Sequence, residues 1–275
     1  MTLASAARRF EGLSTQRVAL GISYRGLAYQ GWQSQASGQT VQDKLEKALS
    51  CFADQAIHTL CAGRTDAGVH GLNQVVHFDT TVARELVSWI RGTNRYLPSD
   101  IAVQWCRFVA PEFHARSSAR GRRYIYILRE SPVRPALESG LVGWVFRPLE
   151  LLPMQVAVRH LLGEHDFSSF RAAQCQALSP VKTLHAIEIS QRGGYWRFEF
   201  DASAYLHHMV RNIMGCLLAI GQGGYQPDWM LEVLRARSRK AAAPTFAAEG
   251  LYFSTPYYDE KWNLPLRTVA HEWLP

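Results

Sequence analysis

The sequence predicts an α+β protein in which the order β-α-β-β-α-β occurs twice. Apolar residues alternate with polar ones over short runs, as in strands, and recur every three or four residues over longer runs, as in helices. The two kinds of run follow one another in the same order in both halves. The 275 residues are long enough for one large domain, or for two half-size lobes that share a core.

The first half contains six expected elements. In chain order these are a strand at residues 17–24, a helix from residue 41, strands at 57–61 and 74–79, a helix at 84–91 and a strand at 101–105. The first helix is expected because Val41, Leu45 and Leu49 share one helical face and Thr40 can cap the first turn. The two middle strands flank a loop that contains glycine, which makes this loop a candidate site.

The second half repeats that order. Its expected elements are a strand at 122–128, a helix at 154–162, strands at 183–190 and 195–201, helices at 204–220 and 228–237, and a strand at 251–254. The pair Gly193 and Gly194 joins the two middle strands and indicates a tight hairpin.

This element order is the ferredoxin-like one, so we expect two such lobes related by a pseudo-repeat. Their sheets are expected to be packed or joined side by side, with an active-site cleft between the lobes. The expected division is a flexible arm at 1–16, a lobe at 17–115 that carries the Asp66 loop, and a lobe at 116–275 that carries Tyr124 and Arg211. Sequence identity between the halves is not visible, so this prediction depends on element order alone.

Composition narrows the classes of protein. The formal net charge of +7 favours a polyanionic partner without identifying one. The five cysteines are scattered and form no C-x-x-C pair, which favours reduced core thiols over a disulfide framework or a zinc site. No apolar stretch reaches the length of a membrane helix, and residues 1–16 lack the apolar run of a secretory signal. A cytoplasmic protein is therefore expected.

The most informative stretch is residues 61–71, in which three glycines lie within nine residues. Arg64 and Asp66 stand two apart, so in an extended segment both side chains share one face and the cation can keep the carboxylate ionised. An ionised carboxylate in a dry site suits nucleophilic attack on a sugar carbon or a uracil ring. The alternative is that Asp66 is only a turn residue, because Asp before Ala-Gly is common turn chemistry.

Arg211 is a second candidate, because it lies on an expected helix that is apolar on most faces. His207, Arg211 and Gly215 would form one row of that helix. A buried charge needs a partner, which could be a ligand or Asp66, and the alternative is a snorkelling or internally paired arginine. His207 and His208 would point about 100° apart on a helix and no third ligand is evident, so no metal site is expected.

Tyr124 and two basic clusters complete the candidates. Tyr124 lies in an alternating strand, where packing is its default role, although a tyrosine can also stack on a base. Each basic cluster is either a phosphate-binding surface or an ordinary solvated face. The first comprises Arg116, Arg120, Arg122 and Arg123, and the second comprises Arg235, Arg237, Arg239 and Lys240.

Residues 63–70, Gly-Arg-Thr-Asp-Ala-Gly-Val-His, closely resemble the signature of the TruA family of tRNA pseudouridine synthases. Further blocks resemble the family in its own order, between about Val18 and Tyr258. They lie at residues 74–78, 97–98, 100–101, 113–116, 123–126, 163–167, 207–212 and 249–252.

The resemblance implies an isomerase that converts uridine to pseudouridine in the anticodon arm of tRNA, around tRNA positions 38 to 40. Base flipping, a homodimer, tRNA as partner and no cofactor are implied with it. Asp66 falls on the catalytic aspartate, Arg64 and Arg211 on supporting arginines, and Tyr124 on the tyrosine that stacks on the target base. The expected substrate-binding set is Tyr124, Arg116, Arg122, Arg123 and His114.

Two other functions are weighed against this one. A catalytically silent RNA-binding or chaperone protein would bind tRNA whether or not Asp66 is present. An aspartate-based nucleoside hydrolase would release free uracil, and retaining glycosidases usually need a second carboxylate near the first. Glu112 or Asp166 could supply it.

Overall fold

The computed structural model describes residues 15–265, in which ten strands form one sheet. The strands are β1 (Gln16–Tyr24), β2 (Leu60–Cys61), β3 (His70–Thr80), β4 (Ile101–Val109), β5 (Gly121–Glu130), β6 (Gly143–Val145), β7 (Gly163–Asp166), β8 (Val181–Arg192), β9 (Tyr195–Ala202) and β10 (Leu251–Tyr257). The α-helices are α2 (Val41–Ala53), α3 (Leu86–Tyr96), α4 (Leu151–Arg159), α5 (Met209–Gly221) and α6 (Trp229–Ala236). Short 3₁₀ turns are η1 (Gly26–Ala28), η2 (Ser168–Phe170), η3 (Arg239–Ala241) and η4 (Glu260–Trp262).

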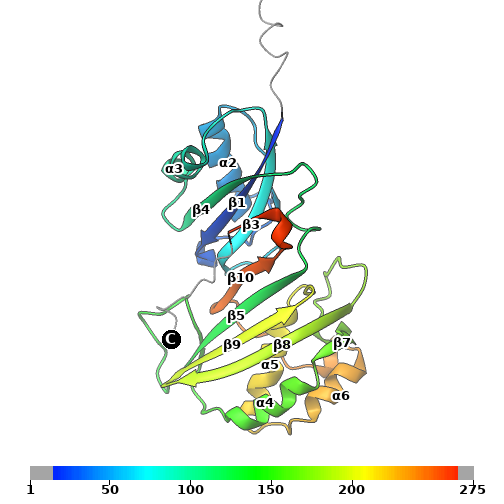
Figure 1. Ribbon diagram of the computed structural model, residues 1–275. Helices are drawn as coiled ribbons and strands as arrows, with labels where there is room; N and C mark the ends of the chain where they lie inside the picture. Colours follow the sequence, from blue (N-terminus) through cyan, green and yellow to red (C-terminus); the bar gives the residue numbers. More distant parts are fainter. Residues whose placement is uncertain (1–14, 266–275) are drawn as a thin grey trace, which may run out of the picture.

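The two halves of the sheet have corresponding strand orders. The first half runs β4-β1-β3, with β2 also paired to β3, and the second half runs β10-β5-β9-β8, with β7 at the outer edge. Neighbouring strands within these two paths are antiparallel, and the halves meet where β10 runs parallel to β3 (Figure 1). The predicted α+β class is confirmed as a mixed fold with a large, mostly antiparallel sheet. The origin of the halves in a repeat stays a prediction.

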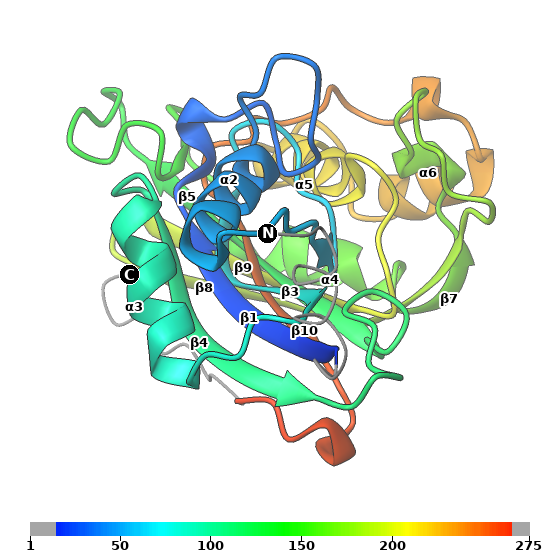
Figure 2. The ribbon, with the colours of Figure 1, turned by 90° about the horizontal axis from the view of Figure 1, so that it is seen from above.

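The first half has its own core between the sheet and two helices. Thr40 caps α2 through a capping box with Asp43, as its position before the apolar residues predicted. Val18, Leu20 and Ile22, alternate residues of β1, pack against α2 and α3 in one buried cluster. The two helices lie side by side over this part of the sheet (Figure 2).

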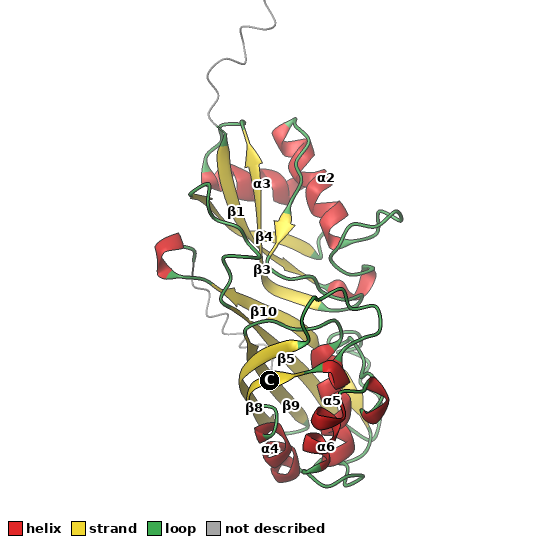
Figure 3. Ribbon diagram, turned by 90° about the vertical axis from the view of Figure 1, so that its right-hand side faces the viewer, coloured by secondary structure: helices red, strands yellow, loops and turns green. Residues whose placement is uncertain are grey.

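The second core lies under α4, α5 and α6, which line one side of the second half of the sheet (Figure 3). Tyr126 and Leu128 of β5 and Phe198 and Phe200 of β9 are completely buried there. The same cluster continues through Phe113 and Ala115 to the first half, so the two halves share buried contacts.

The joint between the halves positions the site. Strands β2 and β10 pair with the same edge of β3, β10 at its beginning and β2 near its middle. Cys61 of β2 lies opposite Val76, whereas Phe253 of β10 lies opposite Gly71. The connection from β2 to β3, residues 62–69, therefore lies where the two halves meet.

Several element boundaries differ from the sequence prediction, and two of these differences affect the site. The strand expected at 57–61 is only Leu60–Cys61. The helix expected over 204–220 begins at Met209, because His208 has a left-handed backbone with φ 62° and ψ 5°. Residues 204–208 are therefore a loop, and the predicted helical row that contained His207 is wrong.

Two further observations concern the N-terminal arm and membrane-spanning helices. The arm expected at 1–16 lies outside the described residues except for residues 15 and 16, and Gln16 already begins β1. Among the described helices, none is long and apolar enough to cross a membrane.

Candidate functional site

The connection 62–69 contains a tight turn at residues 66–69 and is hydrogen-bonded to the first half of the molecule. The Val69 N–H donates to the Asp66 carbonyl at 3.1 Å, and Gly68 supplies the positive φ of +83° that this turn requires. The Trp32 N–H donates to the Thr65 carbonyl at 3.0 Å, and the Tyr24 and Thr65 hydroxyls are 2.8 Å apart. Asp66 is thus a turn residue, as one interpretation of the sequence expected, and its side chain also lies in a cavity.

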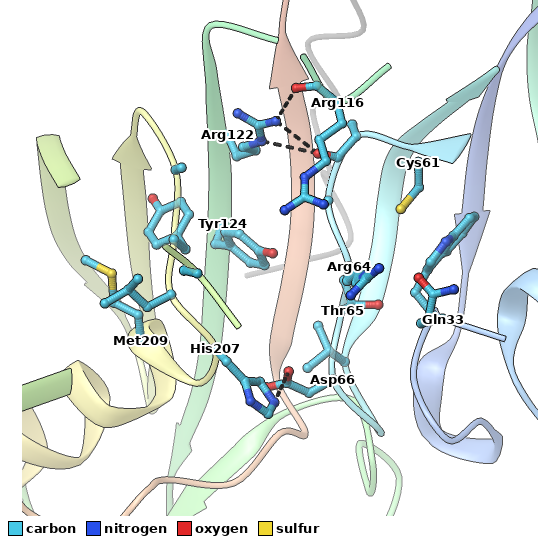
Figure 4. A pocket seen from close by; sticks show the side chains of 18 of the residues that line it. Gln33, Cys61, Arg64, Thr65, Asp66, Arg116, Arg122, Tyr124, His207 and Met209 are labelled. Atoms are coloured by element: carbon cyan, nitrogen blue, oxygen red, sulfur yellow. Dashed lines mark hydrogen bonds and ion pairs between the residues drawn. The ribbon is translucent and has the colours of Figure 1, made fainter. Parts of the chain in front are cut away.

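That cavity has a volume of about 870 Å³ and lies between the two halves. Its wall comes from the Asp66 connection, the segment from His114 to Tyr124, the loop at 175–177 and residues 204–211. Asp66 is the one carboxylate among the described residues that line it. Figure 4 shows Asp66 opposite Tyr124 and Met209, with His207 beside it.

Three basic side chains contact the Asp66 carboxylate. His207 Nε2 lies 3.3 Å from Oδ1, and His208 Nε2 lies 3.4 Å from Oδ2. Arg211 Nη1 donates to Oδ2 at 3.3 Å, while Arg211 Nε donates to the Phe246 carbonyl at 2.8 Å. The carboxylate is 20% exposed, so a substrate can reach it although its neighbours screen it from bulk water.

These contacts keep the carboxylate ionised. Burial acts to raise the pKa of Asp66, but the hydrogen bond from His207 and the charges of His208, His207 and Arg211 outweigh burial and lower it. The hydrogen bond to Asp66 raises the pKa of His207, whereas burial lowers the pKa of His208. The site therefore presents an anion that is compensated by His207, His208 and Arg211.

Arg64 does not hold Asp66, which corrects the sequence-based expectation. Among the described residues, the ion pairs of Asp66 are with His207, His208 and Arg211. The prediction assumed an extended segment, but the backbone turns at Asp66. Arg64 is exposed on the wall of the cavity, near Gln33 (Figure 4).

Tyr124 lies across the cavity from the Asp66 connection. Its ring packs edge-on against Tyr205 and Phe253, with centroids 4.9 Å and 5.2 Å away. Burial, together with the charge of Asp66, raises the pKa of Tyr124 far above the ordinary value of 10.0. The phenol is therefore protonated at neutral pH, and its ring is locked in place by packing.

The first basic cluster divides between structural and exposed positions. Arg122 is largely occupied by the protein, since its guanidinium donates to the carbonyls of Ala62, Ser203 and Arg116. Arg116 is exposed on the cavity wall and forms no ion pair with another described residue. His114 also lines the cavity, where its Nδ1 accepts the N–H groups of Arg116 and Ser117.

Arg123 is not brought to the cavity. It follows Arg122 in β5, and successive side chains of a strand point to opposite faces. On the far face it contacts Asp201 at 3.1 Å and Glu199 at 3.9 Å. A substrate-binding role at this cavity is therefore not supported for Arg123, and the period of two in the strand could have separated it from Arg122 and Tyr124.

The second basic cluster lies at the end of α6 and just after it. Arg237 pairs with Asp166 at 3.4 Å, and Arg239 donates to Thr245 Oγ1 at 3.0 Å.

Neither Asp166 nor Glu112 lines the cavity, so neither is placed to act as a second carboxylate beside Asp66.

Asp66, His207 and His208 each offer a ligand atom, and these atoms lie within 4.8 Å of one another. The sequence argument missed this grouping because it assumed that both histidines lie on a helix. Arg211 contacts the same carboxylate, however, and its fixed positive charge disfavours a second cation. The arrangement is that of a carboxylate ion-paired with basic side chains.

The sequence did not predict that His207 and His208 contact Asp66, or that Tyr205 packs against Tyr124. The histidines were visible in the matching block at 207–212, but their common direction depends on the left-handed backbone of His208. Cys175 was likewise not singled out; its Sγ accepts the His207 N–H at 3.4 Å.

Known proteins that are similar to this chain in sequence are tRNA pseudouridine synthases. A family model described as tRNA pseudouridine synthase matches residues 157–259. The tRNA pseudouridine synthase A of Methylibium petroleiphilum is 68% identical over 259 residues, covering 94% of this chain and 100% of that protein. The enzyme of the same name from Polaromonas sp. is 66% identical over 263 residues with the same coverage. A solved archaeal box H/ACA sRNP Nop10–Cbf5 complex aligns at 11% identity with a TM-score of 0.32, over 82% of this chain and 59% of that one.

Proposed function

This chain belongs to the tRNA pseudouridine synthase A family, and we propose that Asp66 is the carboxylate with which it isomerises uridine in tRNA. The expected family and activity are confirmed: the chain is an isomerase that converts tRNA uridine to pseudouridine. The observation that carries the role of Asp66 is its position as the one carboxylate among the described residues that line the cavity. It is also ionised and accessible there.

In the proposed reaction the bond from C1′ to N1 of uracil breaks, the ring turns, and C1′ bonds to C5. N1 gains a hydrogen and C5 loses one, so the reaction is redox-neutral and needs no cofactor. Asp66 would attack C1′ or assist cleavage of the glycosidic bond, and addition at C6 is the other course open to a carboxylate. An anion held by hydrogen-bond donors in a screened site suits either step.

The target base must leave its stack, which costs a few kcal/mol and requires a pocket that replaces the lost stacking. We assign that stacking to Tyr124, because its ring is fixed by Tyr205 and Phe253 on the wall across from Asp66. Its protonated hydroxyl is a poor acceptor for the C5 proton. Removal of the C5 proton by Tyr124 is a separate hypothesis, and a Tyr124→Phe variant that releases that proton at the normal rate would exclude it.

Arg64 and Arg116 are assigned to the RNA. Both are exposed on the cavity wall, and neither forms an ion pair with another described residue. Arg64 could occupy the space that a flipped base vacates, and Arg116 could contact a phosphate. Arg211 is assigned to Asp66, which it contacts directly.

We further propose the anticodon arm, around tRNA positions 38 to 40, as the target. A homodimer in which both subunits contact each tRNA, a cytoplasmic location and a division of the chain near residue 115 belong to the same proposal. Family membership and the motif blocks of the sequence support these assignments.

The test is tritium release from tRNA labelled at C5 of uridine, since C5 must lose its hydrogen when pseudouridine forms. The parent protein is expected to release tritium, and Asp66→Asn to release none while binding tRNA as tightly. Asp54→Asn is the matched control, because Asp54 is exposed at the end of α2. Release by Asp66→Asn at the parental rate would show that another group performs the chemistry.

A further inference from the structure

Two adjacent histidines hold different oxygens of one carboxylate. His207 Nε2 faces Asp66 Oδ1 and His208 Nε2 faces Oδ2, at 3.3 Å and 3.4 Å. The torsion that turns an aspartate carboxylate about its Cβ–Cγ bond is intrinsically broad. A contact at each oxygen restricts that rotation, whereas the hydrogen bond from Arg211 is to Oδ2. The pair therefore fixes the plane of the carboxylate in a way that Arg211 does not.

The backbone of the two histidines is itself held in place. The His207 N–H donates to Cys175 Sγ at 3.4 Å, and the His207 carbonyl accepts the Ala172 N–H at 3.0 Å. His208 has φ 62°, a left-handed conformation that costs a residue other than glycine about 1–3 kcal/mol. This conformation lets both imidazoles, with centroids 4.1 Å apart, reach Asp66.

The charges around the pair differ between the two rings. The groups that face His207 are Asp66, His208, Cys175 and Arg211, and Arg239 also acts on His208. The hydrogen bond to Asp66 raises the pKa of His207, and burial lowers the pKa of His208. His207 therefore keeps its proton to a higher pH than His208 does.

We propose that His207 and His208 are positioning residues that hold the Asp66 carboxylate in the plane from which it meets the target nucleotide. The proposal rests on the catalytic role of Asp66 given above. Displacing a reacting group by about 1 Å can lower a rate by about 100-fold, so a carboxylate free to rotate would react more slowly although the tRNA still binds.

The experiment is single-turnover tritium release from C5-labelled tRNA, with enzyme in excess, for His207→Ala, His207→Gln and His208→Ala. The rate is expected to fall by about 10- to 100-fold in both alanine variants, while tRNA affinity changes little. Added imidazole should restore part of the rate of His207→Ala. His185→Ala is the matched control, because His185 is exposed on β8 and does not line the cavity.

The pH profile separates positioning from a merely structural effect. His207 lowers the pKa of Asp66, so its loss should move the acid limb of the single-turnover rate to higher pH. His207→Gln can keep a hydrogen bond without the charge, so it should show this shift with a smaller loss of rate at pH 8. If His207→Ala does not fold, the glutamine variant and its profile decide the question.

Three results would overturn the proposal: an unchanged rate in both alanine variants, a loss confined to tRNA affinity, or pH profiles that superimpose on the parental one. Failure of the proposed function is a different outcome, because the parent protein would then release no tritium from any unmodified tRNA.

Discussion

The connection from β2 to β3 in the first half and the corresponding connection from β8 to β9 in the second half differ sharply. In the first half it is the connection 62–69, which leaves the sheet at the joint and carries Asp66. In the second half it is the hairpin of Gly193 and Gly194, which joins β8 to β9 away from the cavity. The strand orders correspond, yet one connection forms the site and the other only turns the chain.

The difference shows that topology alone does not place the chemistry. A connection can carry function where the scaffold brings it against another part of the molecule. Here the joint of β3 with β10 brings residues 62–69 to face β5 and the loop before α5. The second half supplies His207 and His208 from the loop before α5 and Arg211 from its first turn, so the site combines connections that do not correspond.

Among the variants that test this comparison of the two connections, the largest effect is expected at the glycines that have positive φ. Gly68 and Gly193 have φ of +83° and +59°, so alanine at either position should cost about 1–2 kcal/mol of stability. Gly68→Ala should also lower single-turnover tritium release by about 10-fold or more, because it disturbs the turn that holds Asp66. Gly193→Ala should release tritium at the parental rate. Equal rates in the two variants would remove the distinction between the connections.

A smaller effect is expected from two arginines on β5 and just before it. Arg116→Met should weaken tRNA binding several-fold and reduce the slope of log affinity against log salt concentration by about 1, because Arg116 is exposed in the cavity. Arg123→Met is the control, since Arg123 pairs with Asp201 on the far face. Binding titrations across a salt series would measure both, and equal losses would place the far face in contact with tRNA.

The smallest effect concerns stability against pH. Asp66 has a folded-state pKa below its ordinary 3.8, so its contribution is present above that value and is lost as pH falls through the folded pKa. His207 has a folded-state pKa above 6.5, so its contribution is complete below 6.5 and is lost as pH rises through the folded pKa. As pH rises through the folded-state pKa of His207, calorimetry should show the Tm of the parent protein falling by a few degrees relative to that of His207→Gln. Parallel curves would argue against the ion pair with Asp66.

Local sequence patterns predicted most elements because local chemistry governs them. The cap at Thr40, the alternation in β5 and the Gly193–Gly194 hairpin each depend on neighbouring residues alone. The helix expected from residue 204 failed at its first turn, because His208 has a left-handed backbone, which is uncommon for residues other than glycine. The predicted Arg64–Asp66 pair failed because spacing in sequence gave no warning that the backbone turns at Asp66.

By itself the sequence determined the α+β class, the family, and Asp66 as the candidate carboxylate, because these follow from periodicity and from a contiguous motif. The partners of that carboxylate were decided only by the tertiary structure. Asp66 and Arg211 are 145 residues apart in the chain, and the pairing of β10 with β3 and the shared buried core bring their halves together. The side-chain directions of His207, His208 and Arg123 depend on backbone conformation and strand face. Contacts between distant segments therefore assembled the site from residues whose local sequence does not reveal their partners.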